Sequence, residues 1–438
     1  MSDAAHSACA QAYARPEVQR TLGIFAAWRL QAYGCALAIL YIALLFHLYR
    51  DGVWLVDSAG KPIYTEFTCA WAAGLQALNG QAASIYDPTE FLNIQKALAG
   101  AKATYAIWPY PPTFFLFLAP FAALPYVAAF LTWNVVTVLG CIGAIYLIVP
   151  RLPAIVLLFA SPFTVWNFLT GQNGYLTASL IGAGLLVLER QPVLAGVFIG
   201  CLTYKPHLGI LFPVALVASR RWRAFASAAV TATLLAGASI AVFGTGVWEA
   251  FPRMLIAFAR GTLLAQNSEI FLAYPALDPA QYWGRVQTVY GIIRYLDGGR
   301  LLAWVAQGIT TLGLVATVWF VWRSRVRYPL QAATLSAAAL IATPYAFAYD
   351  LAAIAIPLAL LASDQIRFGL LKGEQTTLLV LFAASLAVFL TLGRIPFGPL
   401  IVLTLLGLVL RRALLPCDDP SPDRGGAIVA HMTSTQRV

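Results

Sequence analysis

The sequence predicts an all-α, polytopic membrane protein, and three observations support this fold class. Of its 438 residues, 60% are hydrophobic and only 11% are charged, whereas soluble domains carry about 25% charged residues. The mean hydropathy is +0.76. Apolar runs of membrane-spanning length recur along the chain, since a helix needs roughly 20 apolar residues to cross a bilayer. We therefore expect a chain that crosses the membrane many times.

The positive charge of the chain does not indicate a nucleic-acid partner. The formal net charge is +10, but the arginines cluster at the ends of the apolar runs, where the positive-inside rule expects them. We therefore expect membrane lipids, and no nucleic acid, among the partners. The six cysteines are scattered and the four histidines lie far apart, so neither a disulfide framework nor a metal site is predicted. No cofactor is expected, although a loosely bound divalent cation stays compatible with the sequence.

The apolar runs give the expected membrane spans in chain order. The first run lacks a small-residue cleavage site, so we interpret it as an anchor rather than a signal peptide. Two shorter runs, 330–345 and 350–363, are further candidates. The clear candidates are 30–49, 127–149, 152–169, 174–189, 223–243, 301–322, 376–393 and 396–412.

Two segments leave the topology open. Segment 113–124 is short for a crossing, and segment 193–219 is long but is interrupted at Lys205-Pro206-His207. In the first topology, 113–124 crosses the membrane and 193–219 is one helix. In the second, 113–124 is re-entrant or interfacial, and 193–219 is a hairpin of two half-helices with Lys205 at its apex. The second topology places more Lys and Arg in the cytoplasm, so we favour it, with roughly twelve spanning or half-spanning segments and both termini cytoplasmic.

We divide the chain into three parts. Residues 1–29 form a cytoplasmic N-terminal segment, 30–412 the membrane domain, and 413–438 a polar cytoplasmic tail that is expected to be disordered. Two long extracytoplasmic loops, at about 50–112 and 244–300, interrupt the membrane domain.

The first of these loops is predicted to contain two helices. Apolar side chains recur at helical spacing over 66–79, a pattern typical of a helix lying on the membrane surface. Further on, Asp87 is suited to an N-cap, Pro88 to the first helical position and Glu90 to a capping box, and Gly100 closes this second helix.

Two charged residues stand out as functional candidates. The carboxylate of Glu66 is expected near the lipid headgroups, although it could simply be a helix-starting acid, and Asp51 and Asp57 are rivals in the same loop. Lys205 lies inside an apolar segment, where a lysine costs at least ~2.5 kcal/mol and is a functional candidate by default. The proline after it breaks the helix, which suits a cavity wall. The alternative is a lysine that extends to the interface.

Other polar candidates lie in turns and in the second loop. Gln172 and Asn173 lie in a glycine-flanked turn, where their amides could bind hydroxyl groups, although a plain turn explains them equally well. Asp350 could orient a sugar hydroxyl or merely cap a helix. Arg285 and Arg294 could hold a phosphate, although surface arginines are common.

Several short motifs follow one another across residues 64–207. They are Glu66-Phe67, Trp71-Ala72-Ala73, Tyr86-Asp87-Pro88, Tyr110-Pro111-Pro112, Gly171-Gln172-Asn173 and Lys205-Pro206. Their order and approximate spacing resemble family 87 of the glycosyltransferases, which are polyprenyl-phosphate-sugar-dependent enzymes with the GT-C membrane fold. The sequence departs from the family in two places. Glu66 stands where the family usually has Asp, and Tyr349-Asp350 has no histidine beside it.

The resemblance implies a GT-C-like fold and glycosyl transfer at the outer face of the cytoplasmic membrane. A sugar, with mannose as the family-level expectation, would move with inversion from a polyprenyl-phosphate donor to a lipid or glycan acceptor. Glu66 would act as general base, and Lys205, with Arg285 and Arg294, would bind the donor phosphate. The residues expected to bind the sugar and the acceptor are Trp71, Tyr110, Gln172, Asn173, Tyr349 and Asp350.

Two other function classes stay open on the sequence. A transporter or flippase for lipid-linked sugars would also bury a lysine at a broken helix, but internal repeats would then be expected, and no convincing repeat is found. A non-catalytic membrane scaffold would explain the hydropathy but not the interruption at Lys205.

Overall fold

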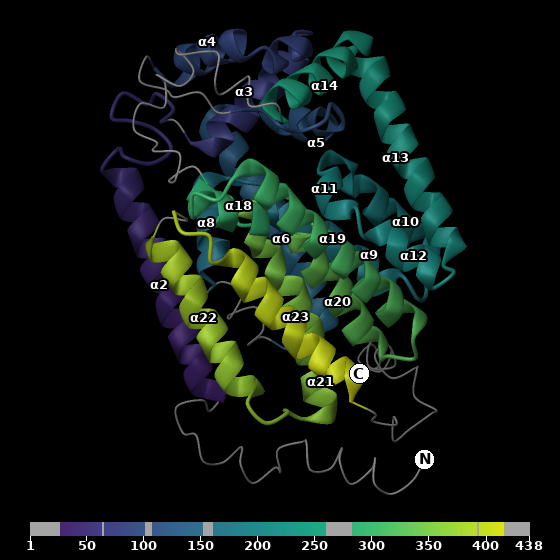
Figure 1. Ribbon diagram of the computed structural model, residues 1–438. Helices are drawn as coiled ribbons and strands as arrows, with labels where there is room; N and C mark the ends of the chain where they lie inside the picture. Colours follow the sequence, from purple (N-terminus) through teal and green to yellow (C-terminus); the bar gives the residue numbers. More distant parts are fainter. Residues whose placement is uncertain are drawn as a thin grey trace, which may run out of the picture.

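The computed structural model is a helical molecule (Figure 1). Within the residues that it describes, all regular elements are helices, and β-structure is limited to isolated bridges. The predicted all-α class is therefore confirmed. The N-terminal segment and the C-terminal tail lie mostly outside the described residues, which are 27–63, 65–100, 107–151, 161–259, 283–391 and 394–415.

The elements carry the labels of Figure 1. In chain order they are α2 (Ala27–Arg50), α3 (Glu66–Leu78), η3 (Ala82–Tyr86), α4 (Pro88–Ala99), α5 (Thr113–Ala122), α6 (Tyr126–Ile148), α8 (Pro162–Thr170), α9 (Gly174–Val187), α10 (Pro192–Cys201), η4 (Leu202–Tyr204), α11 (Pro206–Gly209), α12 (Phe212–Ala218), α13 (Trp222–Phe243), α14 (Thr245–Ala259), α18 (Val289–Tyr295), α19 (Arg300–Arg323), α20 (Tyr328–Ile341), η5 (Asp350–Ile354), α21 (Ala355–Phe368), α22 (Glu374–Leu390) and α23 (Gly398–Leu414).

The long apolar helices support a membrane protein. Five described helical stretches are long and apolar enough to cross a membrane, and shorter apolar helices accompany them. Nearly all expected spans coincide with described helices, whereas only the second half of span 152–169 is described, as α8. The count of roughly twelve segments stays a prediction. The five long stretches are Ala32–Arg50, Tyr126–Ile148, Trp222–Phe243, Arg300–Arg323 and Asp350–Phe368.

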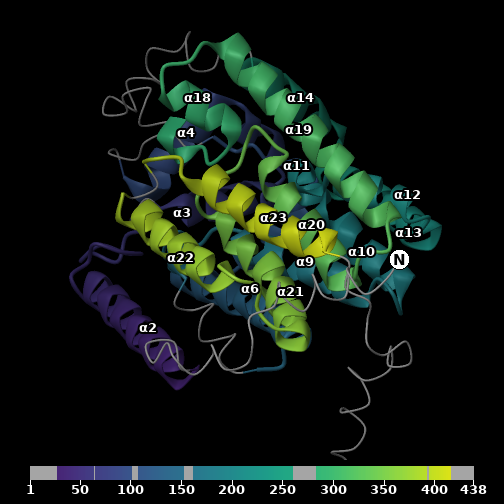
Figure 2. The ribbon, with the colours of Figure 1, turned by 60° about the horizontal axis from the view of Figure 1, so that its bottom comes forward.

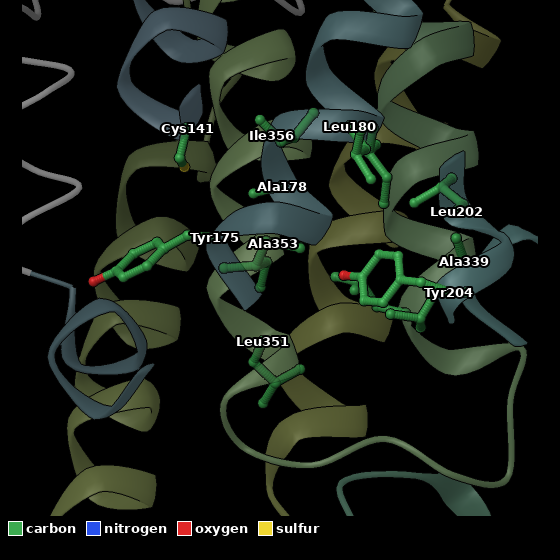
Figure 3. Close-up of a cluster of buried hydrophobic side chains, with 14 of the residues drawn as sticks. Cys141, Tyr175, Ala178, Leu180, Leu202, Tyr204, Ala339, Leu351, Ala353 and Ile356 are labelled. Carbon is green, nitrogen blue, oxygen red and sulfur yellow. The ribbon is translucent and has the colours of Figure 1, made fainter. Parts of the chain in front are cut away.

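Small residues allow the helices of the bundle to pack closely. A Cβ atom on Gly182 of α9 would lie 2.8 Å from Ala144 Cβ in α6 and 2.8 Å from Ile356 Cδ1 in α21, so these three helices meet at that glycine. Figure 3 shows part of the resulting core, in which side chains of α6, α9, α20 and α21 lie together. At the edge of the bundle, the rings of Tyr41 and Phe389 join α2 to α22, with centroids 6.0 Å apart (Figure 2).

The two helices predicted in the first loop are present. Thr65 caps α3, which the sequence predicted at 66–79, and Asp87 caps α4 by accepting bonds from two backbone N–H groups. Gly100 ends α4 with a positive φ of 92°, a conformation that glycine adopts readily. Helix α3 is more buried than expected, because the face that carries its small residues, among them Ala73, Gly74 and Ala77, packs against α5. Its position on a membrane surface stays a prediction.

The interrupted segment folds as a hairpin, as the favoured topology requires. Its two ends meet, because Arg221 Nη2 lies 3.4 Å from Glu189 Oε1. Helix α10 runs parallel to α13, since Gly196 packs near Ser227 and Gly200 packs near Thr231. The chain therefore runs away from Glu189 through α10, turns at η4 and α11, and returns through α12 to Arg221. Lys205 lies at the apex, between η4 and α11, and the single-helix alternative is wrong.

Candidate functional site

A cavity of ≈ 270 Å³ lies at the N-terminal end of α3. Its wall combines the start of α3, the segment before α5, the turn between α8 and α9, the segment before α18 and the segment after α20. These parts are far apart in the sequence, so only the fold brings them together. The predicted site residues that line the cavity are Glu66, Tyr110, Gln172, Asn173, Arg285 and Tyr349.

Glu66 places a carboxylate in this wall. It is the first residue of α3, and its Oε2 atom is enclosed without a hydrogen-bond partner in the described part of the chain. Burial raises the pKa of Glu66 above its ordinary value, although a hydrogen bond from Gln172 and the charge of Arg285 act in the opposite direction. A carboxylate whose pKa is raised is a better proton acceptor, because it holds a proton more firmly.

The turn between α8 and α9 holds the two amide side chains. Gly171 has a φ of +65°, and a Cβ atom at this position would lie 2.6 Å from Phe67 Cβ, so no other residue fits without strain. Asn167 fixes the turn by donating to the backbone oxygen of Gln172 and accepting from the backbone N–H of Gly174. Gln172 is thereby aimed at Tyr110, whose hydroxyl donates to its Oε1 over 3.4 Å.

A buried ion pair lies behind the cavity. The side chains of Lys205 and Asp350 are 2% and 1% exposed, and they bond directly to each other. Lys205 Nζ also donates to Asn173 Oδ1 over 2.8 Å, and Asp350 Oδ2 accepts from the backbone N–H of Phe347 over 2.9 Å. Neither charged residue lines the cavity. The pair therefore reaches the cavity through Asn173, and a direct contact of Lys205 with a donor phosphate would require the pair to open.

Besides Lys205 and Asp350, two further predicted residues, Trp71 and Arg294, do not line the cavity. Trp71 donates its indole N–H to the backbone oxygen of Leu124 over 3.1 Å. Arg294 donates to the backbone oxygen of Gly298 over 3.0 Å and lies over the ring of Trp283.

The rival acids in the first loop have local partners. Asp51 pairs with His47 over 3.2 Å. Asp57 accepts from two backbone N–H groups of its own turn, those of Ala59 and Lys61.

Arg394 also lines the cavity, although it was not predicted as a site residue from the sequence. Its signal was weak, since it is a lone arginine between two apolar runs and could be explained by the end of a span. Among the residues that the structure describes, no group of three or more His, Cys, Asp or Glu side chains is arranged to hold a metal ion.

The family assignment adds the activity to this geometry. The model of glycosyltransferase family 87 matches residues 108–344, which is more than half of the chain. The chain belongs to glycosyltransferase family 87. Membership in this family implies a membrane glycosyltransferase. The matched range includes Tyr110, Gln172, Lys205 and Arg285, whereas it begins after Glu66. No curated protein and no solved structure matches the chain.

Proposed function

We propose that this glycosyltransferase moves a sugar from a polyprenyl-phosphate donor to a lipid or glycan acceptor, and that the sugar is mannose. The reaction takes place at the outer face of the cytoplasmic membrane. The observation that carries the proposal is the enclosed Oε2 of Glu66, which lies in the same cavity as Arg285 and Arg394. A base for the acceptor and cations for the phosphate thus share one reaction space.

Glu66 is the base in this proposal. The acceptor oxygen attacks the anomeric carbon from the side opposite the phosphate, and the bond between that carbon and the phosphate oxygen breaks. The acceptor proton passes to Glu66, and the polyprenyl phosphate leaves with the bonding electron pair, so the anomeric configuration inverts. Because the phosphate is already a competent leaving group, the second carboxylic acid of glycoside hydrolysis is not needed.

Arg285 and Arg394 bind the donor phosphate in this proposal. The buried side chain of Gln287 holds their segments together, because its Nε2 donates to the backbone oxygen of Ile395 and its Oε1 accepts from the backbone N–H of Gly398. A guanidinium group can bind two phosphate oxygens at once. Two guanidinium groups that line one cavity can therefore stabilise the charge that develops on the departing phosphate.

Lys205 takes a supporting role in this proposal. Its charge is already compensated by Asp350, and it fixes the side chain of Asn173 at the cavity wall. The sugar then contacts Asn173 and Gln172 through their amides, and the rings of Tyr110 and Tyr349 provide apolar faces for it. This combination of amides and aromatic rings suits a carbohydrate, which has both hydroxyl groups and C–H faces.

A transfer assay tests the proposal. The purified protein is given radiolabelled mannosyl polyprenyl phosphate and extracted membrane lipids, and labelled product is measured. Glu66→Gln should lower the rate by roughly 10²–10⁴-fold, since it removes a positioned base. Arg394→Gln should weaken donor binding by about tenfold or more, as expected for hydrogen bonds to a charged group. Glu90→Gln, at an exposed acid of α4, is the matched control and should keep the parental rate.

Three outcomes would contradict parts of the proposal. Transfer from a nucleotide sugar, with none from any polyprenyl-phosphate sugar, would reject the donor class. Transfer of another sugar, with none of mannose, would reject the sugar alone. A Glu66→Gln enzyme at the parental rate would reject the base.

A further inference from the structure

A second cavity lies at the opposite end of the helices from Glu66, where α12 meets α13 and α19 meets α20 (Figure 1). Its volume is ≈ 490 Å³. Three of its lining residues are arginines, and no acidic residue is among the described residues that line it. Its lining residues include Arg220, Arg221, Trp322, Arg323 and Gln331.

Contacts within the protein hold part of the wall of this cavity in place. Arg221 pairs with Glu189 over 3.4 Å, and its guanidinium group lies over the rings of Trp322 and Tyr328, 5.9 and 5.4 Å from their centroids. Gln331 donates its amide to the backbone oxygens at the end of α19, and its own backbone oxygen accepts from the indole N–H of Trp322. Arg221, Trp322 and Gln331 are therefore held in place by contacts within the protein.

Arg220 is held in a strained backbone conformation. Its φ is +56°, in the left-handed region that costs a residue other than glycine about 1–2 kcal/mol. The side chain is exposed, and no acidic group of the described residues pairs with its guanidinium group. The positive-inside rule explains why arginines gather at this end. It explains neither the cavity nor an arginine at a position that favours glycine.

We infer that this cavity binds the phosphodiester headgroup of an anionic membrane lipid. Arg220 and Arg323 are exposed and face the cavity, so they can bind the phosphate oxygens. A lipid is favoured over a soluble phosphate because apolar surface continues from the cavity along α13, where Trp222 is 56% and Leu234 67% exposed. Basic pockets between membrane helices bind anionic headgroups in the same way. The inference does not depend on the sugar donor.

Native mass spectrometry of the detergent-purified protein, titrated with short-chain phosphatidylglycerol, tests the inference. Arg220→Gly removes the guanidinium group and relieves the backbone strain. It should weaken phosphatidylglycerol binding about tenfold or more, while the lipid-free melting temperature stays unchanged or rises. Arg323→Gln should weaken binding to a similar extent without depending on the backbone. Arg325→Gln is the matched control, since Arg325 is exposed at the same end but does not line the cavity.

Two comparison ligands show whether the cavity binds a lipid headgroup or a soluble phosphate. Phosphatidylcholine, whose headgroup has no net charge, should bind at least tenfold more weakly than phosphatidylglycerol, and so should soluble glycerol phosphate. Equal loss of binding in Arg220→Gly and Arg325→Gln would reduce the site to a general basic surface and overturn the inference. Glycerol phosphate that binds as well as phosphatidylglycerol would reject a lipid ligand.

Discussion

Glu66 owes its proposed chemistry to its environment rather than to its residue type. An exposed glutamate has a pKa of about 4.3 and is a weak base. At the cavity wall, burial raises this pKa, while Gln172 and Arg285 limit the rise. Glu66 has one methylene more than Asp, so its carboxylate lies further from the backbone of α3 than the carboxylate of an Asp would.

The pH dependence follows from the direction of the pKa shift of Glu66. The base acts only when it is ionised, so the transfer rate should fall as the pH drops through the raised pKa of Glu66, above the range in which an exposed glutamate titrates. The stability changes with the opposite sign. Between the ordinary and the raised pKa, the folded protein retains a proton that the unfolded chain has lost, so the free energy of unfolding falls as the pH rises.

Rate and unfolding measurements over pH check this prediction. Glu66→Gln should remove the pH dependence of stability in that window, and the folded variant should be at least as stable as the parent at neutral pH. An acid limb of the rate profile at the pH where exposed carboxyl groups titrate would contradict a buried base. Glu66→Asp should retain part of the rate, since it keeps a proton acceptor.

Lys205 and Asp350 form a buried ion pair whose disruption should lower the stability of the protein. Removing one charge of a buried pair leaves the other uncompensated, which typically costs about 3–5 kcal/mol. Lys205→Met should therefore destabilise the protein by that amount, as measured by unfolding. Lys205→Met combined with Asp350→Asn should recover most of the loss, because no buried charge remains.

The same double variant tests the role of Lys205 in donor binding. If Lys205 only positions Asn173, the donor affinity of the double variant should change less than about threefold. A direct contact with the phosphate would instead weaken it about tenfold or more. A Lys205→Met protein as stable as the parent would contradict the ion pair itself.

At the scale of elements, local signals in the sequence predicted the structure well. Helix α4 begins after Asp87 and ends at Gly100 as expected, because a helix cap depends only on neighbouring residues. The break at Lys205-Pro206 allowed either one interrupted helix or a hairpin, and the distribution of Lys and Arg favoured the hairpin. Contacts between distant segments could not be predicted. Asp350 lies 145 residues from Lys205 and Gln287 lies 111 residues from Gly398, and one sequence carries no signal that pairs them.

The turn between α8 and α9 gives a prediction at this scale. Gly171→Ala should lower the free energy of unfolding by about 2 kcal/mol or more, because the positive φ and the contact with Phe67 both penalise a Cβ atom. It should also lower the transfer rate, since the turn positions Gln172 and Asn173. Gly80→Ala is the matched control, because Gly80 has a φ of +74° but no neighbouring atom within 4 Å. Equal losses in the free energy of unfolding for the two substitutions would indicate that backbone strain alone, and not the close packing of the turn, causes the loss.

At the scale of the whole molecule, the two cavities lie at opposite ends of the helices. The cavity with Glu66 lies at the end that carries α3 and α4, and the basic cavity lies at the end that carries the α19–α20 turn (Figure 1). Since the arginine-rich end is expected in the cytoplasm, the proposed reaction faces the outside. The proposed sidedness and the proposed reaction are therefore linked.

Labelling of introduced cysteines tests this link. Cys69, at the cavity with Glu66, is buried and unsuited as a reporter, so Lys61→Cys and Arg325→Cys are placed at exposed positions of the two ends. An impermeant thiol reagent on spheroplasts should label Lys61→Cys above the level of the parent chain, and it should label Arg325→Cys only after the membrane is permeabilised. Both variants should keep transfer activity, since neither residue lines the cavity with Glu66. The reverse labelling pattern would place Glu66 in the cytoplasm, and a donor presented at the outer face could then not reach it.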